Sequence, residues 1–222
     1  MKYMLVLVGM FWVTSMQAQT NCGTLNWDAA IVRDCNQYQS TKSLSHVVSD
    51  ALYPVAVGTP LAFYASGYFG KDKFTAQTGL TLAAVEATTF VTVVGLKQLI
   101  GRNRPYVEYP DCITGGENDP LKSFPSGHAA GSAAIVTYLS LRYPKWYVIA
   151  PSVAYFGYTC YARMNLGMHY PTDIIVGALI GGAIGYGGYL LSDSVSESLA
   201  PLMPVTMVKP NNDFSFSISI GL

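Results

Sequence analysis

Apolar residues are grouped along the chain into five long stretches that are separated by polar, turn-rich segments. They are Ala51–Phe69, Ala76–Ile100, Ser126–Tyr143, Trp146–Tyr161 and Thr172–Leu191. The second stretch, about 25 residues long, would form a helix of about 37 Å at 1.5 Å per residue. Such a helix is long enough to cross a hydrocarbon layer of about 30 Å. The pattern predicts an all-α bundle of about five to six helices, transmembrane in type.

Two features inside these stretches bear on how the helices pack. Glu86 lies among apolar residues of the second stretch. It either faces a neighbouring helix through a hydrogen bond or argues against full insertion. The last stretch is rich in glycine between Gly177 and Gly188, which would let helix backbones approach closely in a membrane bundle.

The first eighteen residues have the pattern of a secretory signal. Lys2 precedes an apolar run from about Met4 to Val13, and small or polar residues follow as far as Ala18. We expect cleavage near Ala18, although Met16 is a poor residue three positions before the cut. The alternative is a short, uncleaved first membrane helix. Both interpretations predict an exported protein.

The segments on either side of the predicted bundle have a different character. Residues 19–49 mix apolar and polar positions and predict one or two short amphipathic helices at a surface. We interpret His46, in this segment, as structural. Residues 192–222 contain several prolines and end in alternating apolar and serine positions, and we expect a loosely ordered tail. The predicted division is therefore 1–18, 19–49, a domain over 50–191, and the tail.

The order of stretches predicts which loops share a side. Gly101–Phe124 and Ala162–Pro171 follow the second and fourth stretches, so two crossings separate them and they lie on one side. We expect both to be loops. Positive charge collects instead at Lys71–Lys73 and around Arg142–Lys145, which is where the positive-inside rule places it. The first two loops should then face the exported compartment.

Composition narrows the class of protein further. The 222 residues suit one domain with a tail, and the formal net charge is zero with no long basic run, so nucleic-acid binding is not expected. The four cysteines, Cys22, Cys35, Cys112 and Cys160, fit an oxidising compartment. Cys22 and Cys35 are close in sequence and are a candidate pair, but three full pairings remain open. The chain contains no Cys-x-x-Cys or His-x-x-x-His spacing, so a zinc site is not expected.

The stretch from Arg163 to Asp173 concentrates chemistry in a chain with few charges. Pro171 favours the first turn of a helix, which places His169 just before the helix and Asp173 inside its first turn. Asp173 could then accept a hydrogen bond from one ring nitrogen of His169 and leave the other free to react. We hypothesise that His169 is a nucleophile. The alternative is a surface loop whose charges face water.

Two further groups of residues suggest an anion site. Lys97 and Arg104 come at the end of the second stretch with no acid nearby, although cations at a helix end can also simply reach towards water. Ser126 is a good helix N-cap, followed by Gly127 and His128. Helix N-termini present free N–H groups to phosphate, and Gly127 permits close approach. The alternative is an ordinary capped helix with a solvated histidine.

The three groups in chain order are Lys97-x6-Arg104-Pro105, Pro125-Ser126-Gly127-His128 and Arg163-x5-His169-x3-Asp173. Together they resemble the signature of the type 2 phosphatidic acid phosphatase superfamily, which includes bacterial nonspecific acid phosphatases and vanadium haloperoxidases. The resemblance covers roughly residues 50–191. It departs from the pattern of many members at Ala162, where a serine often stands before the arginine.

The resemblance implies a role for each matching residue. His169 would attack phosphorus and become phosphohistidine, Asp173 would orient it, and His128 would protonate the leaving oxygen. No metal or other cofactor is implied. The implied phosphate-binding residues are Lys97, Arg104, Ser126, Gly127 and Arg163.

These observations predict a metal-independent phosphatase embedded in a bacterial inner membrane, with its site facing the periplasm. The expected substrate is a phosphate ester or pyrophosphate, most simply of a lipid such as phosphatidate, phosphatidylglycerol phosphate or a polyprenyl pyrophosphate. A soluble periplasmic acid phosphatase is the alternative within the superfamily. A vanadium haloperoxidase is a weaker one because such enzymes resemble much longer chains, and a non-catalytic lipid-binding membrane protein is the alternative from another class.

Overall fold

A computed structural model describes residues 22, 24–117 and 120–194 of the chain. The predicted signal segment and nearly all of the predicted tail lie outside the described residues. Within the described part the regular structure is helical throughout, with no strand. The predicted all-α class is therefore confirmed.

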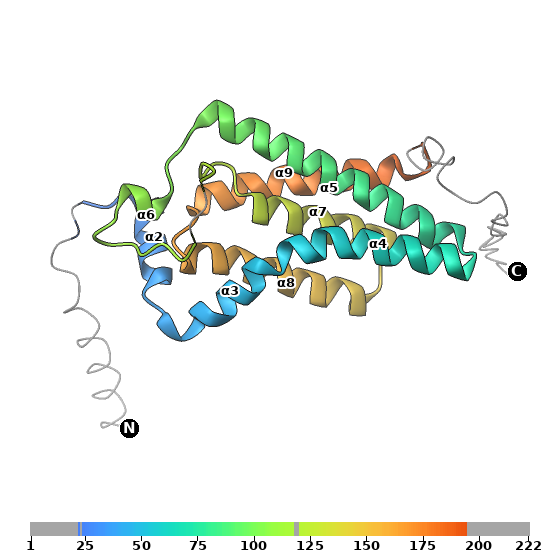
Figure 1. The fold of residues 1–222 in the computed structure, drawn as a ribbon, viewed down its shortest axis with the longest axis horizontal. Helices are drawn as coiled ribbons and strands as arrows, with labels where there is room; N and C mark the ends of the chain where they lie inside the picture. The colour runs from blue at the N-terminus through green and yellow to red at the C-terminus, as the bar shows by residue number, and fades with distance from the viewer. Residues whose placement is uncertain (1–21, 23, 118–119, 195–222) are drawn as a thin grey trace, which may run out of the picture.

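Five long helices form an elongated bundle in which they run lengthwise beside one another (Figure 1). Each corresponds to one predicted apolar stretch, although most of the boundaries differ by a few residues. The helices are α4 (Leu52–Gly70), α5 (Lys73–Ile100), α7 (Gly127–Arg142), α8 (Trp146–Asn165) and α9 (Pro171–Leu190).

Local sequence explains where the longest helix begins and ends. At the start of α5, Asp72 accepts a hydrogen bond from the backbone N–H of Phe74 at 3.0 Å, which satisfies a donor that has no partner inside the helix. At its end, Gly101 takes a left-handed conformation with φ of 66°, which glycine adopts without steric cost. The helix therefore ends just before the predicted anion-binding residues.

Two of the predicted loops contain more helix than expected. The segment Gly101–Phe124 includes the short helix α6 (Pro105–Glu108), so the prediction of a plain loop was wrong there. Helix α8 continues to Asn165 instead of ending near Tyr161, because the chain first reaches a left-handed glycine at Gly167. Arg163 consequently lies in the last turn of a helix rather than in a loop.

The N-terminal segment forms the short helices α2 (Trp27–Asn36), η1 (Gln39–Thr41) and α3 (Lys42–Asp50). Helices α2 and α3 pack against α8. Apolar side chains such as Trp27 and Val47 remain more than 60% exposed, in agreement with the amphipathic surface helices predicted here. The other face of this segment contacts the loop end of the bundle, which is the end where the segments that follow α5 and α8 lie.

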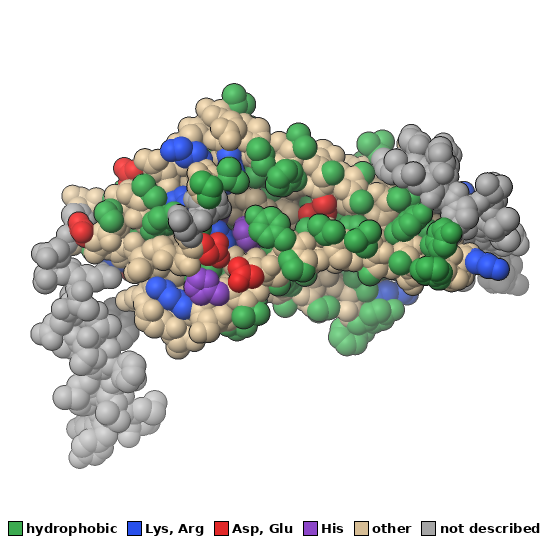
Figure 2. Space-filling model, viewed as in Figure 1, with side chains coloured by type: hydrophobic (Ala, Val, Ile, Leu, Met, Phe, Trp, Pro, Cys, Tyr) green, Lys and Arg blue, Asp and Glu red, His purple; other side chains and the backbone are tan. Residues whose placement is uncertain are grey.

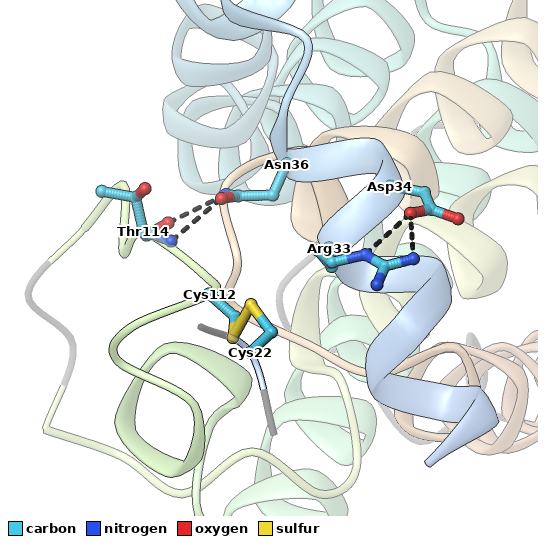
Figure 3. The surroundings of a disulfide bond; sticks show 6 residues. All are labelled: Cys22, Arg33, Asp34, Asn36, Cys112 and Thr114. Atoms are coloured by element: carbon cyan, nitrogen blue, oxygen red, sulfur yellow. Dashed lines mark hydrogen bonds and ion pairs between the residues drawn. A yellow bond between two sulfur atoms is a disulfide. The ribbon is translucent and has the colours of Figure 1, made fainter. Parts of the chain in front are cut away.

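A disulfide joins Cys22 to Cys112, close to the hydrogen bonds between Asn36 and Thr114 (Figure 3). Cys35 and Cys160 are free thiols, so the candidate pairing of Cys22 with Cys35 was wrong. Packing decides the partner: Cys22 precedes α2 and lies beside the segment after α6, whereas Cys35 is near the far end of α2. The bond ties the N-terminal segment to the loop after α5.

Glycines in α9 allow the closest helix contact of the bundle. A Cβ atom at Gly181 would lie 1.9 Å from the carbonyl oxygen of Ala130 in α7, and one at Gly177 would lie 2.4 Å from that of Ser126. No larger residue fits at these distances without a shift of backbone. The close contact brings the first turns of α7 and α9 together, and the Ser126 N–H donates to the Asp173 carbonyl oxygen at 3.0 Å.

The two ends of the bundle carry the loops in the predicted arrangement. At one end, the Gly116 N–H donates to the Leu166 carbonyl oxygen at 2.8 Å, so the segments after α5 and after α8 touch. At the other end, the Arg142 guanidinium lies 3.7 Å above the Phe74 ring. The predicted sharing of sides is confirmed for these loops, and the direction of the bundle relative to a membrane stays a prediction.

The surface of the helices is largely apolar between these ends. Figure 2 shows hydrophobic side chains spread along the bundle, with most of the visible charged and histidine side chains at the loop end. Two segments of the described chain, Lys73–Glu108, which contains α5, and Pro171–Leu190, are long and apolar enough to cross a membrane. With this fold, they indicate a membrane protein.

Candidate active site

His169 and Asp173 lie at the start of α9, as the position of Pro171 predicted. His169 is 1% exposed and Asp173 is completely buried. The Nδ1 atom of His169 is 3.6 Å from Asp173 Oδ2, slightly beyond a direct hydrogen bond. Ser123 bridges the gap, because its hydroxyl donates to the same carboxylate oxygen at 2.5 Å and lies 3.5 Å from His169 Nδ1. The Nδ1 side of the ring therefore faces the carboxylate.

An ion pair with Arg102 holds the other carboxylate oxygen of Asp173. Arg102 donates to Asp173 Oδ1 and to Asp28 Oδ2, each at 2.7 Å, and its guanidinium stacks 3.7 Å from the Tyr170 ring. Asp28 comes from α2 and also accepts from the backbone N–H of Thr172 at 3.1 Å. The N-terminal segment thus helps to fix the carboxylate that faces His169.

The predicted cations Lys97 and Arg104 reach the other side of His169. Arg104 Nη1 lies 3.3 Å from His169 Nε2 and 3.0 Å from the Met168 carbonyl oxygen. Lys97 donates to the carbonyl oxygens of Lys122 and Ser123. Both cations are almost fully buried. The Nε2 side of His169 is therefore surrounded by positive charge, where an oxyanion would be stabilised.

These charges also determine the protonation of His169. Burial and the positive charges of Arg104, Arg163 and Lys97 hold the pKa of His169 well below its usual value. The imidazole is then neutral near pH 7. With its proton on Nδ1, towards the carboxylate, a neutral ring has its lone pair on Nε2. This is the state that a nucleophile requires.

His128 lies in the first turn of α7 and lines the same cavity as His169. It is 8% exposed, and its ring packs edge-on against Tyr53 with 5.9 Å between centroids. Its Nε2 atom is 3.3 Å from the hydroxyl of Ser49, a residue of α3. His128 therefore has a hydroxyl beside its Nε2 atom, whereas His169 has a carboxylate beside its Nδ1 atom.

Arg163 is completely buried in the last turn of α8. Its Nη1 donates to Ser49 and to both carboxylate oxygens of Glu117, at 2.8 and 3.0 Å for the latter. The Nε and Nη2 atoms are buried and have no hydrogen-bond partner among the described residues. One edge of the guanidinium is thus held, and the other has no hydrogen-bond partner in the described part of the chain.

Ser126 caps helix α7, whereas Gly127 lies on the wall of the central cavity. The Ser126 hydroxyl accepts from the Ala129 N–H at 3.4 Å, as an N-cap does, and its role in phosphate binding stays a prediction. A Cβ atom at Gly127 would meet only Val93, at 3.5 Å. Packing does not require a glycine there, although Gly127 does lie on the wall of the central cavity.

A cavity of about 510 Å³ adjoins part of this group of residues, although Arg163, Ser126 and Asp173 are not on its wall. Lys97, Arg104, Gly127, His128 and His169 lie at one part of its wall. The rest is mainly apolar and comes from α4 and α5, including Leu52, Val57, Leu61, Phe90 and Val94. The site therefore combines a cationic region with a long apolar one.

Glu86 also lines this cavity. Its Oε1 atom is buried without a hydrogen-bond partner in the described part of the chain. A Cβ atom at Gly131 of α7 would lie 3.3 Å from Glu86 Oε2. The side chain thus faces the neighbouring helix, as one of the two sequence interpretations held, but without the expected hydrogen bond from that oxygen.

Several site residues were missed by sequence reasoning. Arg102 carried a weak signal, since it stands two positions before Arg104 in a chain with few cations. Asp28, Ser49, Glu117 and Ser123 carried none, because they lie outside the three motifs. Among the described residues, no group of three or more His, Cys, Asp or Glu side chains could hold a metal ion.

Known structures share this fold. The crystal structure of Aquifex aeolicus LpxE aligns with a TM-score of 0.57 at 24% identity, covering 74% of this chain and 95% of that one. The transmembrane PAP2 type phosphatidylglycerolphosphate phosphatase from Bacillus subtilis aligns with a TM-score of 0.55 at 22% identity, covering 78% and 85%. At these identities the similarity establishes the fold.

Sequence relatives are also phosphatases of lipid substrates by name. The lipid A 4'-phosphatase of Bacteroides thetaiotaomicron is 33% identical over 115 residues, covering 50% of this chain and 51% of the relative. The decaprenylphosphoryl-5-phosphoribose phosphatase of Mycobacterium tuberculosis is 32% identical over 92 residues, covering 40% and 48%. The matches thus span about half the length of these relatives.

A family-wide comparison agrees with the three motifs. The family model of the PAP2 superfamily matches residues 77–195. This range is more than half of the chain and includes every site residue predicted from the sequence. The chain therefore belongs to the PAP2 superfamily.

Proposed function

We propose that this protein is a phosphatase that removes phosphate from a phosphorylated lipid through a phosphohistidine intermediate. The observation that carries the proposal is the placement of the buried His169, with Asp173 and Ser123 on its Nδ1 side and Arg104 on its Nε2 side. The relatives named as lipid phosphatases support the reaction class.

In the first chemical step, His169 Nε2 attacks phosphorus while the bond from phosphorus to the leaving oxygen breaks. His128, in its doubly protonated form, gives a proton to that oxygen, which leaves as an alcohol, and the ring becomes neutral. The imidazole of His169 gains positive charge as the N–P bond forms. Asp173 offsets this charge through the Nδ1 side of the ring, which is what a buried carboxylate beside a histidine can do.

In the second step, water attacks the phosphohistidine and the N–P bond breaks. The water proton returns to His128, so the enzyme regains its starting state and inorganic phosphate is released. Lys97, Arg104 and Arg163 offset the phosphoryl oxygens in both steps. Their burial strengthens each interaction, because little water is present to screen it.

The shape of the cavity supports a lipid as the substrate. An apolar wall from α4 and α5 adjoins the cationic region, so a molecule with a phosphate group and an acyl or prenyl chain would match both parts. We further propose that the protein lies in a bacterial inner membrane with this site facing the periplasm. The disulfide at the loop end supports that orientation, because such bonds persist in oxidising compartments.

The direct test is phosphate release by purified, detergent-solubilised protein from lipid and soluble phosphate esters, with a chelator present throughout. We expect hydrolysis of at least one phospholipid or prenyl phosphate. It should be faster than hydrolysis of a soluble alkyl phosphate whose leaving alcohol has a similar pKa. Absence of release from every substrate would overturn the proposal. Loss of activity on chelation, with recovery on adding a metal, would overturn the metal-independent mechanism.

Two measurements separate the alternatives within the superfamily. Extraction of membranes with alkaline carbonate should leave the protein in the pellet, and its release into the supernatant would favour a soluble periplasmic phosphatase. Halide oxidation that appears only with added vanadate would instead identify a haloperoxidase. We expect no such oxidation.

A further inference from the structure

Ser49 contacts both sides of the proposed phosphate site although it lies outside the residues matched by the family. It is in the last turn of α3 and is 1% exposed. Its hydroxyl donates to Glu117 Oε1 at 2.7 Å, accepts from Arg163 Nη1, and lies 3.3 Å from His128 Nε2. A single hydroxyl therefore links one of the phosphate-binding cations to the proposed general acid.

The hydrogen bonds of the Ser49 hydroxyl determine whether Nε2 of His128 carries a proton. A serine hydroxyl has one proton and two lone pairs, and an ionised carboxylate can only accept. The Ser49 proton is used by Glu117, so both lone pairs face Arg163 and His128. Because a lone pair needs a donor opposite it, His128 must carry a proton on Nε2. The contact thus fixes an N–H on Nε2, towards Ser49, so the proton that His128 can give to a leaving oxygen is one carried on its other nitrogen, Nδ1.

The same contacts set the orientation of Arg163. Ser49 and Glu117 bind Nη1, whereas Nε and Nη2 are buried without partners in the described structure. In a guanidinium the free Nε and Nη2 N–H groups form one edge, which matches two oxygens of a phosphate. A serine directly before this arginine is absent here because the position is Ala162. The hydroxyl comes instead from α3.

We propose that Ser49, held by Glu117, is a positioning residue that turns the free edge of Arg163 towards the phosphate and keeps the Nε2 proton on His128. This inference rests on the proposed function, since it assumes that the two residues act on a phosphate ester. It assigns a role in the site to the N-terminal segment, which the motifs do not reach.

Kinetics of Ser49→Ala test the role, with Ser45→Ala as a matched control. Ser45 is on the same helix one turn earlier, is completely buried, and its hydroxyl has no partner among the described residues. We expect Ser49→Ala to weaken inhibition by inorganic phosphate about 10-fold, as the loss of a charge-assisted contact would. Its kcat should fall further for an alkyl phosphate than for p-nitrophenyl phosphate. Ser45→Ala should stay within about twofold on each measure.

Substitutions of Glu117 provide a second test that does not alter the core, because its side chain is 22% exposed. Glu117→Gln keeps an acceptor for the Ser49 proton, so it should lose less activity than Glu117→Ala. An increase of kcat/KM in Glu117→Ala would show that the carboxylate competes with phosphate, and would overturn the positioning role. Equal effects of Ser49→Ala and Ser45→Ala would overturn it as well.

A spectroscopic measurement tests the proton on His128 without any need for activity. The chain has three histidines, so ¹⁵N-labelled imidazole signals can be assigned with His46→Ala and His128→Ala variants. We expect Nε2 of His128 to be protonated in the wild-type protein. Protonation at Nδ1 alone would refute the inference even if phosphatase activity is found. Absence of phosphatase activity together with a protonated Nε2 would refute the proposed function and leave the contact itself supported.

Discussion

The two histidines of the site differ in the side chains that contact their ring nitrogens. His169 has a buried carboxylate and a serine on its Nδ1 side, and its Nε2 side faces Arg104 and the proposed phosphate site. His128 has the hydroxyl of Ser49 on its Nε2 side, which calls for a proton there. The Nε2 atom therefore faces the proposed phosphate site in His169, whereas in His128 it is held by a serine and the other nitrogen is left for proton transfer. Environment, and not residue type, separates the two roles.

Replacement of His169 should have the largest effect. For His169→Ala we expect hydrolysis to fall on the order of 10⁴-fold or more, because the bond-forming atom is removed. Binding of a phosphate analogue such as vanadate should largely persist, since the cations remain. Wild-type protein quenched during turnover of a ³²P-labelled substrate should carry label that is stable in alkali and lost in acid. Unchanged hydrolysis in the variant would show that His169 is not the nucleophile.

Replacement of His128 should have a smaller and more selective effect. For His128→Ala we expect kcat to fall by about 10²- to 10⁴-fold with alkyl phosphates. The loss should be smaller with p-nitrophenyl phosphate, whose leaving group needs less protonation. The measurement is a plot of log kcat against leaving-group pKa for both proteins. A parallel loss on every substrate would contradict the assignment of His128 as the acid.

The contact between α7 and α9 keeps the two histidines together, and Gly181 is its tightest point. Gly181→Ala would place a Cβ atom 1.9 Å from the Ala130 carbonyl oxygen. We expect a loss of about 1–3 kcal/mol in unfolding free energy, as for other overpacked positions, together with reduced kcat. Gly187→Ala is the control, because nothing lies within 4 Å of its added Cβ. Both variants gain the same helix propensity, so the difference in thermal midpoint in detergent isolates the clash.

The pH dependence tests the charges around His169 and should show the smallest change. A protonated imidazole has no lone pair to attack with, and the pKa of His169 is lowered by burial and then by Arg104. Activity should therefore persist as pH falls below about 6.5, the ordinary value for histidine. In Arg104→Gln the lowering is weaker, so the acid limb of kcat/KM should move to higher pH. Arg33→Gln, which removes a pair between neighbours on the surface of α2, should leave the limb in place.

The same substrate is used for the three proteins in this comparison, so titration of the substrate phosphate cancels. An acid limb that stays at the wild-type pH in Arg104→Gln would show that this cation does not control the protonation of His169. In that case the lone pair would depend on burial alone.

Most of the helices could be predicted because their signals are local. Asp72 and Gly101 mark the ends of α5, and Pro171 marks the start of α9, through hydrogen bonds and backbone angles that involve only nearby residues. The end of α8 was placed too early, since nothing near Tyr161 terminates the helix before Gly167. The prediction from apolar pattern therefore failed where the helix continued into polar residues that are buried against the site.

The class of fold, the three motifs and the family to which they point could be predicted from the sequence, because apolar stretches and short motifs are properties of neighbouring residues. Three contacts became known from the folded chain: Cys22 pairs with Cys112, Asp28 supports Asp173 through Arg102, and Ser49 joins Arg163 to His128. These contacts join residues that are distant in the chain. They depend on how the N-terminal helices pack on the loop end of the bundle, and no local pattern encodes that packing.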